Sequence, residues 1–344
     1  KEMRRQRSSL PAGESIFWSQ LLYSIAEALD GGARRLGWNV GPRLHMASVV
    51  AANPNARVVA FPGCDDRVIL YNRRFALFAH RGRQELSTLL EGVTGEREAA
   101  PLDRHGVLRA VRDPALRARY ATYARSIVDV PADDTEQEMS PSVEAMHTGT
   151  QLFAMAHEYA HVARGHAGEL AGNAPASAGD ADWIERWARE LEADYNGVQL
   201  FLTASDVELD GSTRLVRWAP LILLTDLESL HYLQRLDGGP GAPPAWPDPG
   251  VAERALRDAL RELPRTPATD DFAAIVAGLD LRAWSGRGHP PEHLRAEVVR
   301  LALLRNEAIT ADEYAGFSPA DAWRLGLRTL YNDVAPALAA ARDR

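Results

Sequence analysis

The chain has 344 residues, of which 46% are hydrophobic and 25% charged, so it can bury a large core in one big domain or two smaller ones. The net charge of −8 argues against a nucleic-acid-binding surface, and the single cysteine excludes an internal disulfide framework and suits a reducing, cytoplasmic compartment. No apolar run approaches the roughly 18 residues that span a bilayer, so we expect no transmembrane segment.

The amino-terminal part of the chain is predicted to contain an amphipathic helix and a β-hairpin. Apolar residues at three-and-four spacing indicate a helix over residues 16–29, which the glycine pair at 31–32 is expected to end. Residues 56–61 and 67–71 read as two strands joined by a turn, so we expect them to pair. This is the only strongly strand-like region. Helical patterns over residues 76–135 carry no recognisable chemistry.

The most informative stretch lies in a helix predicted over residues 141–165, for which Ser140 suits the N-cap position. His157 and His161 are one helical turn apart on the same face, so both imidazoles can reach a single ion. Glu158 projects about 100° away around the helix axis, where it can hydrogen-bond a metal-bound water without ligating the metal. This is the His-Glu-x-x-His arrangement of zinc peptidases. The alternative is that the two histidines only fill a core.

Two histidines do not complete such a site, because a catalytic zinc usually takes three protein ligands. The metzincin pattern would need a glycine three residues after His161 and a histidine six residues after it. The chain instead places His166 five residues after His161. We therefore expect His166 to lie at the end of the helix, where its positive form suits the dipole, and not to ligate.

The predicted third ligand is Glu190, in a helix over residues 184–198 whose apolar residues form one face. Glu190 and Asp194 lie on an adjacent face beside small residues, which permit another helix to approach closely. Asp194 is placed to accept the outer N–H of a ligand histidine, expected to be His157, and so to fix its tautomer. Glu192 points to the other side and is expected to be solvated. The alternative for the acidic pair is an ordinary charged helix face.

The carboxyl-terminal half is predicted to be mostly α-helical. Helical patterns occur over residues 215–236 and near residues 250–263, 292–306 and 319–342. A Gly/Pro-rich loop at 238–244 is a candidate for a flexible connection or the edge of a lid, and a plain surface loop is the alternative.

Several motifs in chain order carry a family resemblance: Asn55-Ala56, Pro62-Gly63, Val68-Ile69-Leu70, His157-Glu158-x-x-His161 and Glu190-x-x-Ala193-Asp194. This order resembles the catalytic core of the HtpX and CAAX-prenyl-endopeptidase type of gluzincin, and also the phage-exclusion Lit peptidases. A further element of the former group, a His-Pro with an arginine six residues after the histidine, is present as His289-Pro290 and Arg295. The chain differs by lacking their transmembrane helices and by Arg57, where their hairpin commonly carries an aromatic residue.

The resemblance implies a zincin-like metallopeptidase core of the α+β class, predominantly α-helical, with a small β-hairpin beside the active-site helix. We expect a single domain over residues 1–344. Within it, residues 1–140 would hold the first helix, the hairpin and further helices. Residues 141–205 would hold the zinc-binding helices, and residues 206–344 a helical carboxyl-terminal half.

We predict a zinc-dependent endopeptidase that holds one Zn²⁺ per chain on His157, His161 and Glu190. The ion would polarise the scissile carbonyl and lower the pKa of its bound water to near 7. Glu158 would take that water's proton as general base and pass it to the leaving amine. A polypeptide substrate would bind in extended form by strand addition at the hairpin edge.

The donor to the tetrahedral oxyanion is the least explicit part of the predicted site. His289 precedes two prolines, which hold its backbone extended at a loop-to-helix junction. The resemblance implies that this stretch contacts the metal site and that Arg295 pairs with an acidic residue such as Asp194. The alternative is that His289 and Arg295 only brace the following helix. His231 and Tyr232 are the reserve donors.

The competing hypothesis is a catalytically silent zinc-binding protein with a regulatory or interaction role. A latent enzyme, which a regulatory partner opens, is an intermediate case. Glu158 argues against the silent protein, because a purely structural zinc site has no use for that carboxylate.

Overall fold

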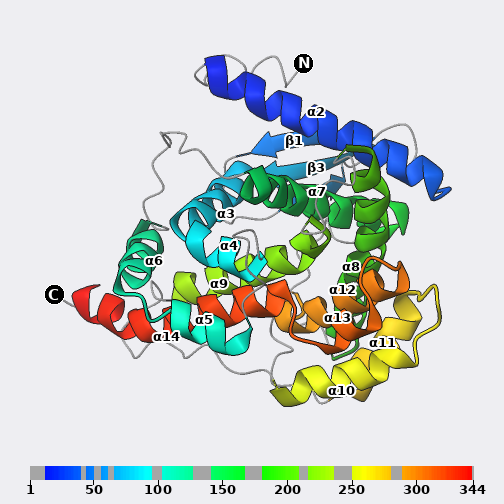
Figure 1. Cartoon of the computed structure of the whole chain (residues 1–344). Coiled ribbons are helices and arrows are strands. Elements are labelled where there is room, and N and C mark those ends of the chain that lie inside the picture. Colours follow the sequence, from blue (N-terminus) through cyan, green and yellow to red (C-terminus); the bar gives the residue numbers. More distant parts are fainter. Residues whose placement is uncertain are drawn as a thin grey trace.

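The computed structural model describes residues 12–39, 44–49, 56–60, 66–94, 103–126, 141–166, 180–208, 216–235, 250–279 and 289–342. These residues are mostly helical and include a small three-stranded sheet, so the predicted α+β class with a predominance of helix is confirmed (Figure 1). None of the helices in these ranges has both the length and the apolar character needed to cross a membrane.

The sheet contains β1 (Leu44–Val49), β2 (Ala56–Ala60) and β3 (Arg67–Asn72) in the order β1-β3-β2. β3 pairs antiparallel with β2, which confirms the predicted pair of strands. The turn predicted between them falls almost entirely outside the described residues. β1 pairs parallel with β3 and was not predicted, because His45 and Ser48 interrupt its apolar pattern. β2 is consequently an edge strand of this sheet.

The long helix α7 (Pro141–Ala163) lies beneath the sheet and packs against a second long helix, α8 (Asp180–Glu208) (Figure 1). The two helices approach closely at Gly197, where an added Cβ would lie 3.0 Å from the Cα and 3.2 Å from the N of His157. Beyond the end of α7, Gly165 has a φ of 77°, the left-handed conformation that favours glycine at a helix end. The predicted N-cap, Ser140, lies outside the described residues.

The first described helix, α2 (Ala12–Arg35), packs on α8 and crosses β1 (Figure 1). The prediction that the glycine pair at 31–32 ends this helix is wrong. A Cβ at Gly32 would lie 3.0 Å from the Leu200 side chain and 3.3 Å from the backbone N of Ala204. This glycine therefore serves the close packing of α2 on α8, and the turn comes at Gly37, which has a φ of 69°.

The remaining helices surround this central group. Before α7 come α3 (Arg73–Glu85), α4 (Ser87–Thr94), α5 (Arg104–Ala110) and α6 (Pro114–Ser126). After α8 come a 3-10 turn at Val216–Trp218, α9 (Ala219–Arg235), α10 (Gly250–Arg261), α11 (Thr269–Gly278), α12 (Glu292–Arg305), α13 (Ala311–Ala315) and α14 (Pro319–Arg342). The four predicted carboxyl-terminal helices are confirmed as α9, α10, α12 and α14, whereas α11 and α13 were not predicted. The Gly/Pro-rich loop at 238–244 lies outside the described residues.

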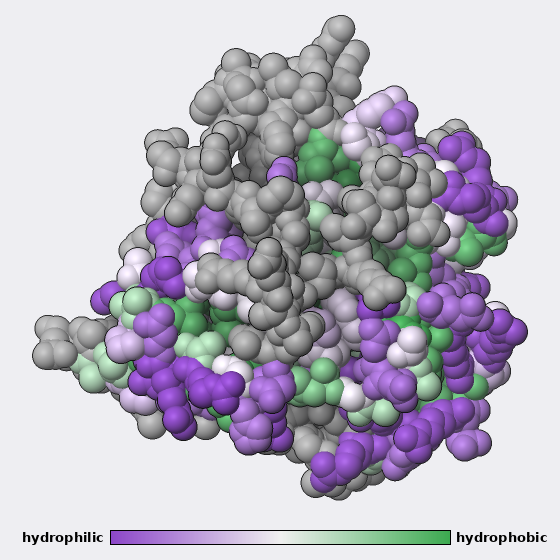
Figure 2. All heavy atoms as spheres, viewed as in Figure 1, coloured by the Kyte–Doolittle hydropathy of each residue, from purple (hydrophilic) through white to green (hydrophobic). Residues whose placement is uncertain are grey.

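The surface of α10 is strongly polar on its outer side, where Figure 2 shows hydrophilic side chains at the lower right. The inner side of the same helix contributes Leu256 and Leu260, both of which are buried. Their four-residue spacing places them on one helical face, which packs on α12. The helix thus closes one side of the core and presents charge to water.

A buried polar network ties α9 to three other helices. The guanidinium of Arg83 on α3 is fully buried, donates to Asp226 on α9, and lies 2.8 Å from Nδ1 of His147 on α7. The indole N–H of Trp323 on α14 donates to the other oxygen of Asp226 at 3.0 Å. Burial, together with Arg83, holds the pKa of His147 well below its ordinary value, so this ring is neutral and can accept from the guanidinium.

Candidate metal centre

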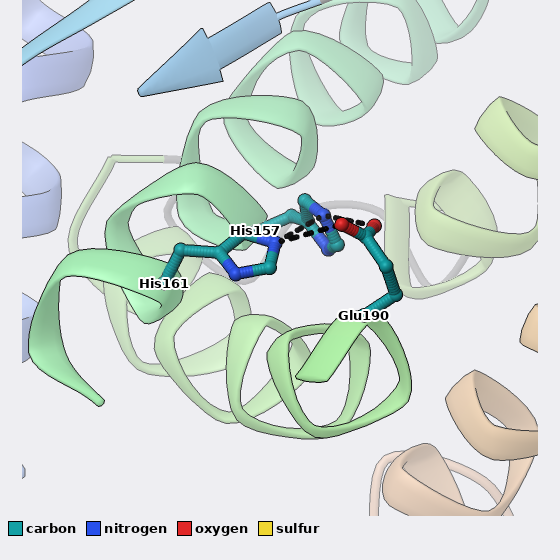
Figure 3. A group of neighbouring side chains, drawn as sticks. All are labelled: His157, His161 and Glu190. Atoms are coloured by element: carbon teal, nitrogen blue, oxygen red, sulfur yellow. Dashed lines mark hydrogen bonds and ion pairs between the residues drawn. The ribbon is translucent and has the colours of Figure 1, made fainter. Parts of the chain in front are cut away.

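Two helices bring three metal-ligand side chains together. His157 and His161 on α7 and Glu190 on α8 are all buried and point toward one another (Figure 3). The two histidine Nε2 atoms are 3.2 Å apart. The carboxylate of Glu190 completes the group, with one oxygen 3.4 Å from Nε2 of His157 and the other 3.5 Å from Nε2 of His161.

These separations fit a single small cation. Zinc bonds to nitrogen and oxygen are about 2.0–2.2 Å long, so a tetrahedron places neighbouring ligand atoms roughly 3.3–3.5 Å apart. The two Nε2 atoms are 3.2 Å apart, and each has one oxygen of the Glu190 carboxylate within 3.5 Å, Oε2 for His157 and Oε1 for His161. The group could therefore hold a metal ion with two nitrogen ligands and a carboxylate, and among the described residues it offers three ligands.

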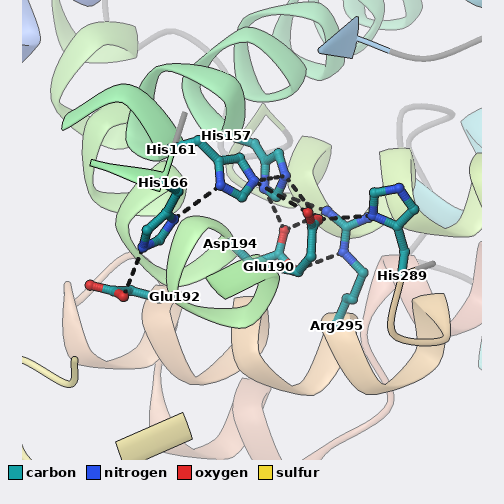
Figure 4. A network of polar contacts seen from close by, with 8 residues as sticks. All are labelled: His157, His161, His166, Glu190, Glu192, Asp194, His289 and Arg295. Carbon is teal, nitrogen blue, oxygen red and sulfur yellow. Dashed lines mark hydrogen bonds and ion pairs between the residues drawn. The ribbon is translucent and has the colours of Figure 1, made fainter. Parts of the chain in front are cut away.

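A buried carboxylate orients His157 from its outer side. Oδ1 of Asp194 lies 2.9 Å from Nδ1 of His157, and the guanidinium of Arg295 holds Asp194 through two hydrogen bonds of 2.8 Å each (Figure 4). Burial raises the pKa of Asp194, but Arg295 outweighs burial and holds it below its ordinary value. Burial lowers the pKa of His157, but Asp194 and Glu190 raise it to about 9. The outer nitrogen of His157 therefore keeps its proton, and Nε2 faces the centre.

His161 has a different outer partner, which the sequence reasoning missed. Its Nδ1 lies 3.0 Å from Nδ1 of His166, and Nε2 of His166 lies 3.2 Å from Oε2 of Glu192 (Figure 4). The expectation that Glu192 is solvated is wrong, because Thr269 at the start of α11 donates to it and only 5% of it is exposed. His166 lies just beyond the end of α7 and outside the three-residue group, as predicted, and it is buried in contact with His161.

A cavity of about 410 Å³ is bordered by His157 and Glu190 of the ligand group and by Glu158. This volume lies in the range of sites that enclose small ligands. The apolar lining comes from α7 and α9: Phe153, Ala154, Leu223, Leu227 and Leu230. The polar lining outside the ligand group comes from α9 and from the segment around α12: His231, Gln234, His289, Glu292 and Arg295. Ala56 at the start of β2 also borders the cavity.

Glu158 lies at this cavity with a largely buried side chain. Burial raises its pKa above the ordinary value, against the opposing effect of His157. Within the part of the chain that the structure describes, no hydrogen bond or ion pair to another residue engages its carboxylate. A carboxylate with a raised pKa is a stronger base, so Glu158 is suited to accept a proton from a molecule in the cavity.

His289 contacts the third ligand. Its Nδ1 lies 3.1 Å from Oε2 of Glu190, and 61% of its side chain is exposed. Glu190 raises the pKa of His289 through its charge and through this hydrogen bond. With Nδ1 donating to Glu190, Nε2 points away from that carboxylate and carries an N–H in the protonated form, which the raised pKa favours.

The two reserve donors lie in different surroundings. Nδ1 of His231 is 2.6 Å from the Glu292 carboxylate, and His231 borders the cavity. Tyr232 packs its ring against Tyr331 with a centroid distance of 5.6 Å and does not border the cavity. The structure thus brings His231 to the site and directs Tyr232 toward α14.

The leucines that form the apolar wall of the cavity are spaced in the sequence as residues on one helical face. Leu223, Leu227 and Leu230 follow one another at helical spacings of four and three residues, which places them on one face of α9. Whether these leucines lie near the metal group depends on which face of α9 packs against α7. Tertiary packing determines that orientation, so the sequence pattern alone does not predict it.

The chain was compared with models of protein families, with curated proteins and with solved structures, and no match was found.

Proposed function

We propose that the protein is a zinc-dependent endopeptidase of the His-Glu-x-x-His type with a zincin-like catalytic core. The observation that carries this proposal is that Glu158 borders the same cavity as His157 and Glu190, two of the three residues that converge to form the candidate metal group. A centre that only stabilised the fold would have four protein ligands and no adjacent base. Here the candidate ligands among the described residues number three, and Glu158 borders the same cavity as two of them.

The chain's own residues would divide the work as follows. Bound zinc supplies a Lewis acid that polarises the scissile carbonyl and lowers the pKa of a coordinated water to about 7. His157, His161 and Glu190 hold the ion. The carboxylate of Glu158 accepts the proton of the attacking water and passes it to the leaving amine. His289, through its Nε2 N–H, donates to the oxyanion of the tetrahedral intermediate.

The position of the sheet supports an extended polypeptide as substrate. β2 is an edge strand, its first residue, Ala56, borders the cavity, and the strand contacts α7. An edge strand offers unpaired backbone groups that can hydrogen-bond an added strand. Such binding would use hydrogen bonds to the backbone of a flexible segment, and it would bring one peptide bond of that segment toward the ligand group.

The first test measures the metal. Elemental analysis should find about one zinc per chain, and His157→Ala, His161→Ala or Glu190→Ala should each abolish it. Zinc retained in full by Glu190→Ala would show that another residue supplies the third ligand.

The second test measures the base. Glu158→Gln should keep the fold and the zinc but lower hydrolysis of unstructured peptides by about two orders of magnitude or more, because it removes the proton acceptor. Glu144→Gln is the matched control, since Glu144 is exposed on the same helix and its loss should change neither zinc content nor turnover. Equal turnover in the Glu158→Gln variant and the wild type would refute the assigned role.

The alternative, a zinc-binding regulatory or interaction protein, predicts a different outcome. Such a protein would bind zinc with the same ligands but would hydrolyse no peptide, and Glu158→Gln would change nothing measurable. The cavity beside the ligand group favours the enzyme, because a silent centre has no need of an open position next to a buried carboxylate.

A further inference from the structure

A chain of polar contacts leads from His161 away from the ligand group to a helix that lies behind it. Nδ1 of His161 is 3.0 Å from Nδ1 of His166, and Nε2 of His166 is 3.2 Å from Oε2 of Glu192. The hydroxyl of Thr269, at the start of α11, donates to the same carboxylate oxygen. Figure 4 shows the first two of these contacts, with the His166 ring between His161 and Glu192.

If His166 is neutral, its hydrogen-bond partners are compatible with only one of its two tautomers. The ionised carboxylate of Glu192 can only accept, so Nε2 of His166 carries the hydrogen. Nδ1 of His166 then has a lone pair and accepts from Nδ1–H of His161. His161 is thereby left with an unprotonated Nε2, which is the atom that faces Glu190 and Nε2 of His157.

We propose that His166 and Glu192 form a positioning relay that fixes the tautomer and the ring orientation of His161 for metal binding. The inference rests on the proposed metal centre but not on peptide hydrolysis. The two ligand histidines then differ in their outer hydrogen-bond partners. His157 contacts the carboxylate of Asp194 directly, whereas His161 reaches the carboxylate of Glu192 through His166. Outer partners of this kind typically change metal affinity by about 10–100-fold when they are lost.

The surroundings of the relay hold its members in place. Gly165, with a φ of 77°, reverses the chain just after α7 and returns the His166 ring toward His161. On the other side, Asn196 donates to the backbone oxygen of Glu192 at 2.8 Å, and Arg164 lies 3.7 Å from the Glu192 carboxylate. His166 and Glu192 are both buried, so neither exchanges its partner for bulk water. The relay is therefore organised before a metal arrives.

The test compares zinc affinity between variants by competition with a fluorescent chelator. His166→Leu removes the acceptor while keeping apolar volume, and should weaken zinc binding by about 10–100-fold. His166→Asn places an amide oxygen near the former Nδ1, so it can still accept from His161 and should recover most of the affinity. His105→Ala is the control for loss of a histidine, because His105 is exposed on α5 and should leave the affinity unchanged.

Each outcome has a separate meaning. Wild-type affinity in a folded His166→Leu variant would overturn the relay while leaving the metal centre standing. Equal losses in His166→Leu and His166→Asn would also overturn it, because a role in packing alone does not distinguish the acceptor. A wild-type chain that binds no zinc would overturn the metal centre and the relay together.

A measurement on the unaltered chain covers the case in which His166→Leu does not fold. Nitrogen-15 spectra of the zinc-loaded protein, with the His166 signals identified by their absence in His166→Asn, report which ring nitrogen carries the proton. The relay requires Nε2 of His166 to be protonated and Nδ1 to be bare. A proton on Nδ1 of His166 would refute it.

Discussion

Gly197 is the residue through which the distance between the two ligand-bearing helices can be altered most directly. In Gly197→Ala the new Cβ would lie 3.0 Å from the Cα of His157 and 3.2 Å from its N. Carbon atoms in good contact are about 3.5–4.0 Å apart, so α8 must move away from α7 by some tenths of an ångström. His157 and His161 share α7 and keep their spacing, whereas Glu190 on α8 moves relative to both.

The expected energies can be compared. Overpacking of this kind costs about 1–3 kcal/mol, and replacing glycine by alanine in a helix returns about 1 kcal/mol, so the zinc-free variant should lose about 0–2 kcal/mol of stability. Zinc affinity should fall as well, by about tenfold, because catalytic and metal groups tolerate displacements of only about 0.5 Å.

Urea unfolding of the zinc-free protein and chelator competition measure the two quantities separately. Gly278→Ala is the matched control, because a Cβ at this helical glycine meets nothing within 4 Å. That variant should be as stable as the wild type or up to about 1 kcal/mol more stable, with unchanged zinc affinity. If Gly197→Ala behaved like the control in both measurements, the close approach of the helices would not be what sets the ligand geometry.

Three further predictions address other parts of the molecule. Arg295→Met should lower the free energy of unfolding by about 3–5 kcal/mol in urea denaturation, because it leaves the fully buried charge of Asp194 without its partner; a loss below about 1 kcal/mol would contradict this. His289→Ala should reduce turnover with little change in zinc content or KM, because the donated hydrogen bond forms mainly after attack, and an unchanged turnover would assign the oxyanion donor elsewhere. Burial raises the pKa of Asp321, but Arg300 at 2.6 Å outweighs it and holds the pKa below 3.8. This ion pair should therefore stabilise the protein above about pH 4 and lose its effect as the pH falls through the lowered pKa. The stability difference between the wild type and Asp321→Asn, measured by urea unfolding across pH, should shrink in acid, and a constant difference would refute the assignment.

The parts of the site that the sequence predicted are those that a single helix determines. The common face of His157 and His161 follows from 3.6 residues per turn, and so does the spacing of Glu190 and Asp194. The prediction that Glu190 joins the two histidines also assumed that their two helices pack against each other. The small residues around Gly197 supported that assumption, because they permit a close approach.

What could not be predicted depends on contacts between distant segments. Glu192 looked exposed because nothing in its own helix shows that Thr269 will lie against it. The β1 strand was missed because its own apolar pattern is interrupted at His45 and Ser48, and its pairing partner β3 is parallel and not adjacent in sequence, so no hairpin signal compensates. The glycine pair at 31–32 reads as a helix end, and only the packing of Gly32 on α8 explains why α2 continues.

The buried ion pair between Arg83 and Asp226 has a consequence for the shape of the cavity. Asp226, Leu223 and Leu227 all belong to α9, so the angle at which Asp226 meets Arg83 and Trp323 also determines which way the two leucines face. Rotation of α9 about its axis, or translation along it, would break the hydrogen bonds of Asp226 to Arg83 and Trp323. A buried charge would then be left unpaired. Apolar contacts alone would resist such a rotation less, because they are not directional. The ion pair therefore fixes the rotation of α9, and with it the shape of the apolar wall, from a different face of the helix than the one that lines the cavity.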